Sequence, residues 1–299
     1  MFRIIVARDS IFSVPVMRSR TYSKKLIPNL RVVATRERFV SQALVPSKES
    51  KMTVYDNIGV LPATPVTYND FNLNVLDPTD VFEFRIDTTQ NINLSLTDIS
   101  AGDDADLRLY QDNGNGFFDT GDQLVDFSSR GNNQDDFLNR RADAGTYFAE
   151  VRRFSGSSGD VSYDLALSAT TPNSTSGFSN LLPREFALGD LSADVTRFGT
   201  ISNTNTTDTY EFSLGFFEGV NITLSGLQSD ADIRLIADYN NNRIVDAGEE
   251  VARSTSAGIT SEVISNTNLS GNYFLQVNQF SSTQTAYTLT FDQFTTTDA

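Results

Sequence analysis

The chain has 299 residues, no Cys, His or Trp, and abundant Ser, Thr, Asn, Asp and Gly. This length accommodates about two domains of ordinary size. Without Cys or His the chain can form no disulfide, no thiolate or imidazole metal site and no Ser-His-Asp triad. The remaining chemistry is that of carboxylates, which act as paired acids or bind hard cations through oxygen.

The net charge of −15 conceals two unlike parts of the chain. Residues 1–51 hold eleven of the 23 basic residues and three of the 38 acidic ones, which leaves 12 basic and 35 acidic residues for the rest. A body of this sign repels nucleic acid and anionic membranes and attracts cations. We therefore expect no nucleic-acid partner, and the lack of a long apolar run predicts no membrane span.

Residues 1–51 are a basic leader that carries every Lys of the chain and has no sustained alternation of apolar and polar residues. Three interpretations stay open: a disordered or mis-assigned leader whose true start is Met52, an export or organelle address, and a functional basic arm. We favour the first.

From Met52 onward the sequence repeats itself, segment by segment and in the same order. Each segment alternates apolar and polar residues, as expected of strands with one buried face. The matched pairs, in chain order, are Asp80–Ile86 with Asp208–Leu214, Ile92–Leu96 with Val220–Leu224, Asp104–Tyr110 with Asp230–Ile236, Ala144–Val151 with Ser270–Val277, and Tyr163–Leu167 with Tyr287–Phe291.

About seven short strands per copy, each with one apolar face, need a second sheet to cover that face. The sequence therefore predicts an all-β protein of two tandem antiparallel, jelly-roll-like β-sandwich domains at 66–169 and 187–294. A segment rich in Ser, Asn and Pro at 170–186 reads as a linker between independently folding domains. We expect a monomer.

The repeated segments resemble the bacterial pre-peptidase C-terminal domain. The resemblance rests on an acid that opens a Tyr/Phe-x-Phe strand, a DADL-type strand, a Tyr-Phe strand after Gly, and a last strand that begins with Tyr. It extends over both copies and excludes residues 1–51. It implies a β-sandwich attached to secreted proteases and exoproteins, in some cases calcium-dependent or bound to an insoluble substrate. The catalytic domain that usually accompanies such a module is not found in this sequence.

A loop in the second copy has the spacing of a calcium loop. Oxygen-bearing side chains fall at positions 1, 3, 5, 9 and 12, and a main-chain carbonyl stands at position 7. Arg243 departs from the pattern, which has Gly at position 6 for a sharp turn. Mutual repulsion among the three acids predicts a strained or mobile loop without the metal. The expected Ca²⁺ ligands are Asp238, Asn240, Asn242, Ile244, Asp246 and Glu249.

The first copy has a similar loop that keeps the glycine, as Gly116. Its position 1 is Gln111, or Asp112 if the loop is one residue shorter. Asn, Asp and Gly also form ordinary turns, so both loops could be metal-free hairpins. We favour calcium, because simple turns do not require acids at positions 9 and 12. The expected ligands are Asp112, Asn113, Asn115, Phe117, Asp119 and Asp122.

Two further acid pairs, Asp104 with Asp106 and Asp230 with Asp232, alternate onto one strand face beside an arginine. We expect a structural ion-pair cluster there, with a second calcium position as the alternative.

These features favour a non-catalytic, calcium-binding accessory or adhesion module of a secreted bacterial protein. We expect it to be extracellular or on the cell surface, with an extracellular protein or a polysaccharide as partner. The alternative is a glycan-active hydrolase, which would need a carboxylate pair about 5–10 Å apart in a cleft. The repeat argues against the hydrolase, because an asymmetric active site rarely occurs twice in equivalent loops.

Overall fold

The computed structural model describes residues 55–154, 159–268 and 270–296. Over these residues the chain forms 18 strands and no helix, which confirms the expected all-β sandwich class. The described residues all belong to one compact unit, and the basic leader 1–51 lies outside the described residues.

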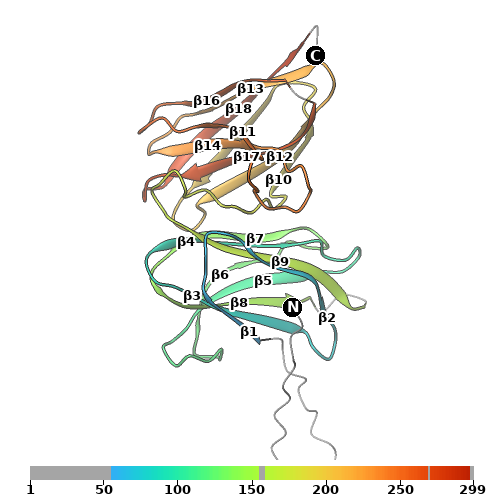
Figure 1. Ribbon diagram of the computed structural model, residues 1–299, viewed down its shortest axis with the longest axis vertical. Helices are drawn as coiled ribbons and strands as arrows, with labels where there is room; N and C mark the ends of the chain where they lie inside the picture. The colour runs from blue at the N-terminus through green and yellow to red at the C-terminus, as the bar shows by residue number, and fades with distance from the viewer. Residues whose placement is uncertain (1–54, 155–158, 269, 297–299) are drawn as a thin grey trace, which may run out of the picture. The chain divides into compact units, whose positions relative to one another are not determined.

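The first module is a sandwich of a five-stranded sheet, in the order β1-β3-β8-β5-β6, and a four-stranded sheet, in the order β2-β9-β4-β7 (Figure 1). Its strands are β1 (Tyr55–Val60), β2 (Val66–Leu73), β3 (Thr79–Ile86), β4 (Gln90–Thr97), β5 (Ala105–Gln111), β6 (Gln123–Ser128), β7 (Asp136–Ala142), β8 (Gly145–Arg153) and β9 (Val161–Thr170).

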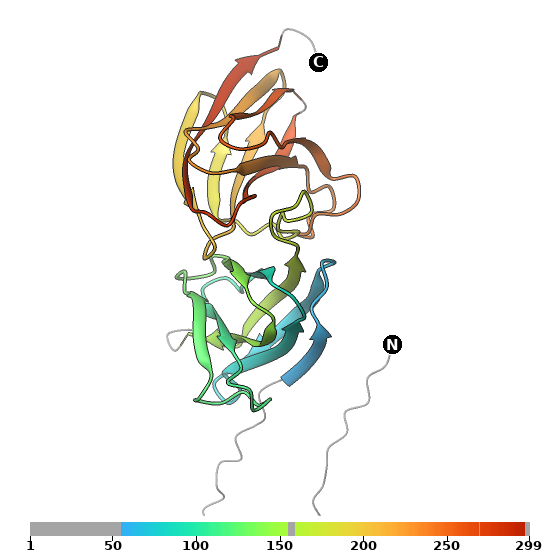
Figure 2. The ribbon, with the colours of Figure 1, turned by 90° about the vertical axis from the view of Figure 1, so that its left-hand side faces the viewer.

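The second module repeats this topology strand for strand, with sheets ordered β10-β12-β17-β14-β15 and β11-β18-β13-β16. Figure 2 shows its strands, coloured from yellow to red, in a second view. Its strands are β10 (Phe186–Asp190), β11 (Val195–Ile201), β12 (Thr207–Leu214), β13 (Glu218–Ser225), β14 (Ala231–Ile236), β15 (Glu250–Ser254), β16 (Glu262–Thr267), β17 (Gly271–Gln279) and β18 (Thr285–Thr295). Each module thus has nine strands where the sequence pattern indicated about seven.

The repeat extends to irregularities of the backbone. The first strand of each module runs parallel to the third, whereas all other pairs are antiparallel. Each parallel pair shifts its register at a glycine with positive φ, Gly59 at 80° and Gly189 at 72°. A conformation of this kind favours glycine, because the residue has no Cβ to collide with the backbone.

Each module buries its own apolar core between its two sheets. Strand β5 alternates buried and half-buried residues, as the sequence pattern predicted for a strand with one covered face. In the first core Phe82, Phe84 and Tyr163 are almost fully buried, and in the second core Tyr210, Phe212 and Phe291 are.

A buried tyrosine–aspartate pair joins the sheets of each sandwich. Tyr163 at the start of the last strand donates a hydrogen bond of 2.5 Å to Asp80 at the start of β3. Tyr287 donates in the same way to Asp208 and lies 2.7 Å from the hydroxyl of Tyr210. Burial followed by the adjacent carboxylate raises the pKa of both Tyr163 and Tyr287, so the phenols stay protonated donors. The acid and the tyrosine that recur in the sequence repeat are therefore partners in the same hydrogen bond in each module.

The segment 171–185, which lies within the linker expected at 170–186, contains residues that pack on the second module. Phe178, Leu181 and Leu182 are each at most 1% exposed. Leu182 joins a small apolar cluster with Ile236 of β14 and Phe274 of β17. The segment therefore covers the outer face of the five-stranded sheet, the face that does not contact the second core.

Candidate metal centres

The second predicted calcium loop connects β14 to β15, so strands hold both of its ends. Two of its carboxylates accept main-chain N–H groups of the loop. Asp238 accepts from Asn242 at 3.2 Å and from Arg243 at 3.0 Å. Glu249, which is 4% exposed, accepts from Tyr239 at 3.0 Å and from Asp246 at 2.8 Å. The first and last predicted ligands thereby close the loop on itself.

The side-chain amides complete the second loop. The amide nitrogens of Asn240 and Asn242 each lie 2.8 Å from Oδ2 of Asp246. Their Oδ1 atoms accept main-chain N–H groups two residues further on, from Asn242 at 3.1 Å and from Ile244 at 2.9 Å. All the predicted side-chain ligands therefore belong to one hydrogen-bonded ring.

The first loop connects β5 to β6 and repeats this scheme. The carboxylate of Asp122 accepts from Asn113 N at 3.1 Å and from Asp119 N at 2.9 Å. The Asn115 amide donates to Asp119 at 2.7 Å, and the main-chain N–H of Gly121 donates to the same carboxylate at 2.7 Å. These bonds hold the pKa of Asp119 below its usual value, so it is ionised at neutral pH.

The hydrogen bonds show which residues of the two loops are equivalent. Gly116 N donates to Asp112 at 3.2 Å, just as Arg243 N donates to Asp238. Asp112 is therefore the counterpart of Asp238, and Gln111 belongs to strand β5. The first loop is one residue shorter, the second of the two alignments that its sequence allowed. Phe117, expected to lend its carbonyl, has its N–H bonded to Asn115 at 2.8 Å, as Ile244 has to Asn242.

The loops differ at the turn position, which is Gly116, the fifth residue of the shorter first loop, and Arg243, the sixth residue of the second. Gly116 has φ of 75° and Arg243 has φ of 63°, so both adopt the left-handed conformation that a sharp turn requires. Glycine adopts it freely, whereas an arginine does so at a cost in conformational energy. The missing glycine thus left the turn unchanged.

The donor set fits a hard cation, because every predicted ligand contributes oxygen. The positions of these oxygens do not form a metal site, because no group of three or more Asp or Glu side chains among the described residues is positioned to hold a metal ion. N–H donors surround Asp238, Asp246 and Glu249 and offset the repulsion among these carboxylates. A cation would have to replace the amide N–H groups that now contact Asp246.

The DADL-type strands place their acids beside a third acid from the neighbouring sheet, which the sequence did not reveal. In the second module Asp232 is 2% exposed, and burial, then Asp230 and Glu262, raise its pKa to about 7. In the first module Asp136 is fully buried, and burial raises its pKa to about 6, with a further contribution from Asp106 and Asp104. The expected ion-pair cluster is thus mainly a cluster of acids. Burial raises the pKa of Asp106 as well, and the nearby Arg108 and Arg152 offset part of that rise.

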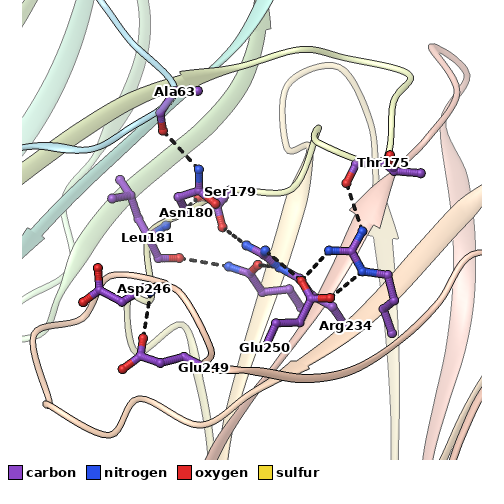
Figure 3. Close-up of polar contacts among 11 residues, drawn as sticks. Ala63, Thr175, Ser179, Asn180, Leu181, Arg234, Asp246, Glu249 and Glu250 are labelled. Atoms are coloured by element: carbon purple, nitrogen blue, oxygen red, sulfur yellow. Dashed lines mark hydrogen bonds and ion pairs between the residues drawn. The ribbon is translucent and has the colours of Figure 1, made fainter.

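A third polar site lies where segment 171–185 crosses the second module (Figure 3). The guanidinium of Arg234 donates to Ser179 O at 2.6 Å and lies 4.8 Å from the centre of the Phe178 ring. Gln276 donates to Leu181 O at 2.9 Å. Beyond it, Leu182 N donates to Arg243 O at 2.9 Å and Val245 N donates to Asn180 O at 3.0 Å. These backbone bonds fasten the second loop to the segment.

Comparison with known proteins identifies one region. Residues 78–153, which lie within the first module, match the model of the bacterial pre-peptidase C-terminal domain. No curated protein matches the chain. Among solved structures, the pre-peptidase C-terminal domain of collagenase from Bacillus anthracis is 21% identical, with 40% of this chain and 97% of that one covered at a TM-score of 0.28. The CUB1-EGF-CUB2 domains of rat MASP-1 are 8% identical, with 80% and 99% covered at a TM-score of 0.24.

Among the described residues there is no helix with the length and apolar character needed to cross a membrane.

Proposed function

We propose that this protein is a non-catalytic accessory or adhesion module of a secreted bacterial protein, with a calcium ion bound in each of its two loops. The observation that carries the proposal is the duplicated loop, in which the same oxygen-bearing residues form the same hydrogen-bonded ring. The match of residues 78–153 to the pre-peptidase C-terminal domain supports the accessory role and an extracellular or cell-surface location. The second module, which has the same strand order, is proposed to be a second copy of that domain.

In the second loop Asp238, Asp246 and Glu249 would supply the charged ligands, Asn240 and Asn242 amide oxygens, and Ile244 a main-chain carbonyl. The two asparagine amides would turn their oxygens to the cation and give up their N–H bonds to Asp246. The first loop would use Asp112, Asn113, Asn115, Phe117, Asp119 and Asp122 in the same roles. Each loop would thus exchange weak amide–carboxylate bonds for ion–oxygen contacts without altering the flanking strands.

A carboxylate-based hydrolase is less consistent with these acids. Asp232 and Asp136 have the raised pKa that a general acid needs, but they are 2% and 0% exposed, so a glycan has no access to them. We therefore propose that the modules bind an extracellular protein or a polysaccharide without cleaving it.

Calcium should raise the melting temperature of the full chain. Extracellular calcium sites have dissociation constants of about 0.1–1 mM, and a hundredfold excess of ligand adds about 2.7 kcal/mol to the free energy of unfolding per site. Magnesium should stabilise less, because it demands a tighter octahedral geometry. The measurement is a thermal melt in chelator and in about 10 mM calcium, a hundredfold excess over a dissociation constant of about 0.1 mM. A calorimetric titration should report two sites.

The double variant Asp238→Asn with Glu249→Gln should lose one of the two sites. A control with the same change in charge is Asp87→Asn with Asp292→Asn, because both of these acids are exposed and distant in sequence from the loops. If wild-type melts in chelator and in calcium coincide and no binding heat is detected, the loops are ordinary turns and the calcium proposal is wrong.

A further inference from the structure

Arg243 occupies a position at which its own backbone conformation favours glycine. Its φ of 63° matches that of Gly116 in the first loop, at 75°. An L-residue in this region is held there only when the surrounding structure compensates for the cost. The compensation should be sought in the contacts of the arginine side chain.

That side chain reaches the first module. The Arg243 guanidinium forms an ion pair of 2.6 Å with Asp135, and the two side chains are 12% and 8% exposed. It also lies 5.3 Å from the centre of the Phe274 ring. Asp135 directly precedes β7 and accepts a second hydrogen bond, of 2.7 Å, from Arg184 N. A buried ion pair of this kind is costly to break from one side, because the remaining charge is left without a partner.

Neighbouring contacts join the same two modules. Strand β7, at an edge of its sheet, receives a backbone hydrogen bond of 2.9 Å from Thr206 N to Asn139 O. Arg141 N donates in return to Asn203 O at 2.8 Å. Asn180 of segment 171–185 also donates to Ala63 O of the first module at 3.0 Å (Figure 3). The ion pair is therefore one of several polar contacts between the modules.

The backbone of Arg243 belongs to the candidate metal loop. Its N–H donates to Asp238 at 3.0 Å, and its carbonyl accepts from Leu182. One residue thus contacts the first ligand of the loop, the segment 171–185 and an acid of the other module.

We propose that Arg243 is a latch that fixes the two modules as one body and couples their arrangement to the state of the second loop. Release of the guanidinium from Asp135 allows the modules to move relative to each other and places an unpaired positive charge beside the loop carboxylates. By linkage, a cation in the loop and closure of the latch then favour each other. This last part rests on the proposed calcium site, whereas the latch itself does not.

The latch can be tested by distance measurement in the full chain. The sequence has no cysteine, so two introduced cysteines carry the only spin labels. Thr88 and Ser192 are exposed and lie in different modules, so Thr88→Cys and Ser192→Cys are suitable sites. We expect one narrow distance distribution in the latch-intact protein, and one about twofold broader after Asp135→Asn, because several arrangements become populated.

Two further variants define the result. Arg243→Gly, which restores the residue of the first loop, should broaden the distribution as Asp135→Asn does. Asp126→Asn breaks an ion pair of 3.1 Å with Arg140 inside the first module and should leave the distribution narrow. An unchanged, narrow distribution in both latch variants, with circular dichroism showing intact folding, would overturn the proposal, as would a broad distribution in the latch-intact protein.

The coupling to the loop is measured separately by calcium titration of the wild type and of Asp135→Asn. We expect the second-loop site to bind about three- to tenfold more weakly in the variant, the range of a modest coupling between sites. Equal affinities would overturn the coupling. Absence of calcium binding by the wild type would refute the proposed calcium sites, while the distance measurement would still decide the latch.

Discussion

The two loops, Asp112–Asp122 and Asp238–Glu249, are built alike and differ in what they contact outside themselves. Both close through main-chain N–H groups bonded to the first and last acids. The turn position is Gly116 in the first loop and Arg243 in the second, where the arginine side chain ends at Asp135. The comparison teaches that the ring of polar residues is sufficient to shape the turn, so the residue at the turn position can take on a contact between modules.

A second difference lies on the outer face of the five-stranded sheets. In the first module Phe118 of the loop itself covers this face. The centre of its ring lies 5.2 Å from that of Tyr110 and 5.4 Å from that of Phe148. In the second module the smaller Val245 stands in the corresponding place, and Leu182 of segment 171–185 fills the remaining space. The second module therefore includes a piece of chain that precedes its first strand.

The largest loss of stability that this comparison predicts comes from replacing Phe178. Replacing it by alanine should lower the free energy of unfolding of the second module by about 3–5 kcal/mol, because the ring is buried and lies over the Arg234 guanidinium. The check is urea unfolding, with Phe216→Ala as control, since Phe216 is 81% exposed. An effect equal to that of the control would mean that segment 171–185 does not support the module.

The next largest effect is a difference between the two modules in how their stability depends on pH. Asp232 has a pKa of about 7 in the folded protein and about 3.8 as an ordinary side chain, so ionisation favours unfolding and stability falls as the pH rises between these values. Asp232→Asn should remove this loss. Its free energy of unfolding should exceed that of the wild type by about 1–2 kcal/mol at pH 8, with little difference at pH 4.

Asp136→Asn, at the acid cluster of the first module, should increase the free energy of unfolding at high pH by less, because the pKa of Asp136 in the folded protein is only about 6. Urea melts of the three proteins at pH 4, 6 and 8 provide the comparison. A difference between variant and wild type that stays constant across this range would show that the acids do not titrate as stated.

The smallest effect concerns the turn of the first loop. Gly116→Ala should cost about 1 kcal/mol, because φ is 75° while an added Cβ meets nothing within 4 Å. Gly131→Ala is the matched control, with equally open space and no positive φ. Thermal melts that show equal changes for both variants would contradict a cost that arises from the backbone alone.

The sequence was most informative where one face of a strand is buried and the other is not. The alternation in Asp80–Ile86 and Asp208–Leu214 located β3 and β12 closely, and the matching Tyr-led segments located β9 and β18. The strands that the matched segments did not include all lie at sheet edges, namely β1, β2, β6 and β7 of the first module and β10, β11, β15 and β16 of the second. Strand β11, for example, exposes Phe198 and has no clear alternation. The predictions for 1–51 and for the module boundaries stay predictions.

The candidate site was predicted in part. The spacing of acids and amides located both loops and nearly all of their hydrogen-bonded residues. The role of Asp135 could not be predicted, because it depends on contact with a residue 108 positions away. The burial of segment 171–185 was hidden by its average polarity, although Phe178, Leu181 and Leu182 among Ser and Asn were a signal that could have revealed it.

The strand order also determines when each module can fold. Strand β11 pairs only with β18, the last strand of its module, and β2 pairs only with β9. Each closing contact therefore spans almost the whole module, and such a high contact order slows folding. During synthesis the early strands must wait, with open edges, until the last strand has left the ribosome. A chain that ends before Tyr287 would keep the edges of β11 and β13 unpaired, so we expect it to aggregate by edge pairing.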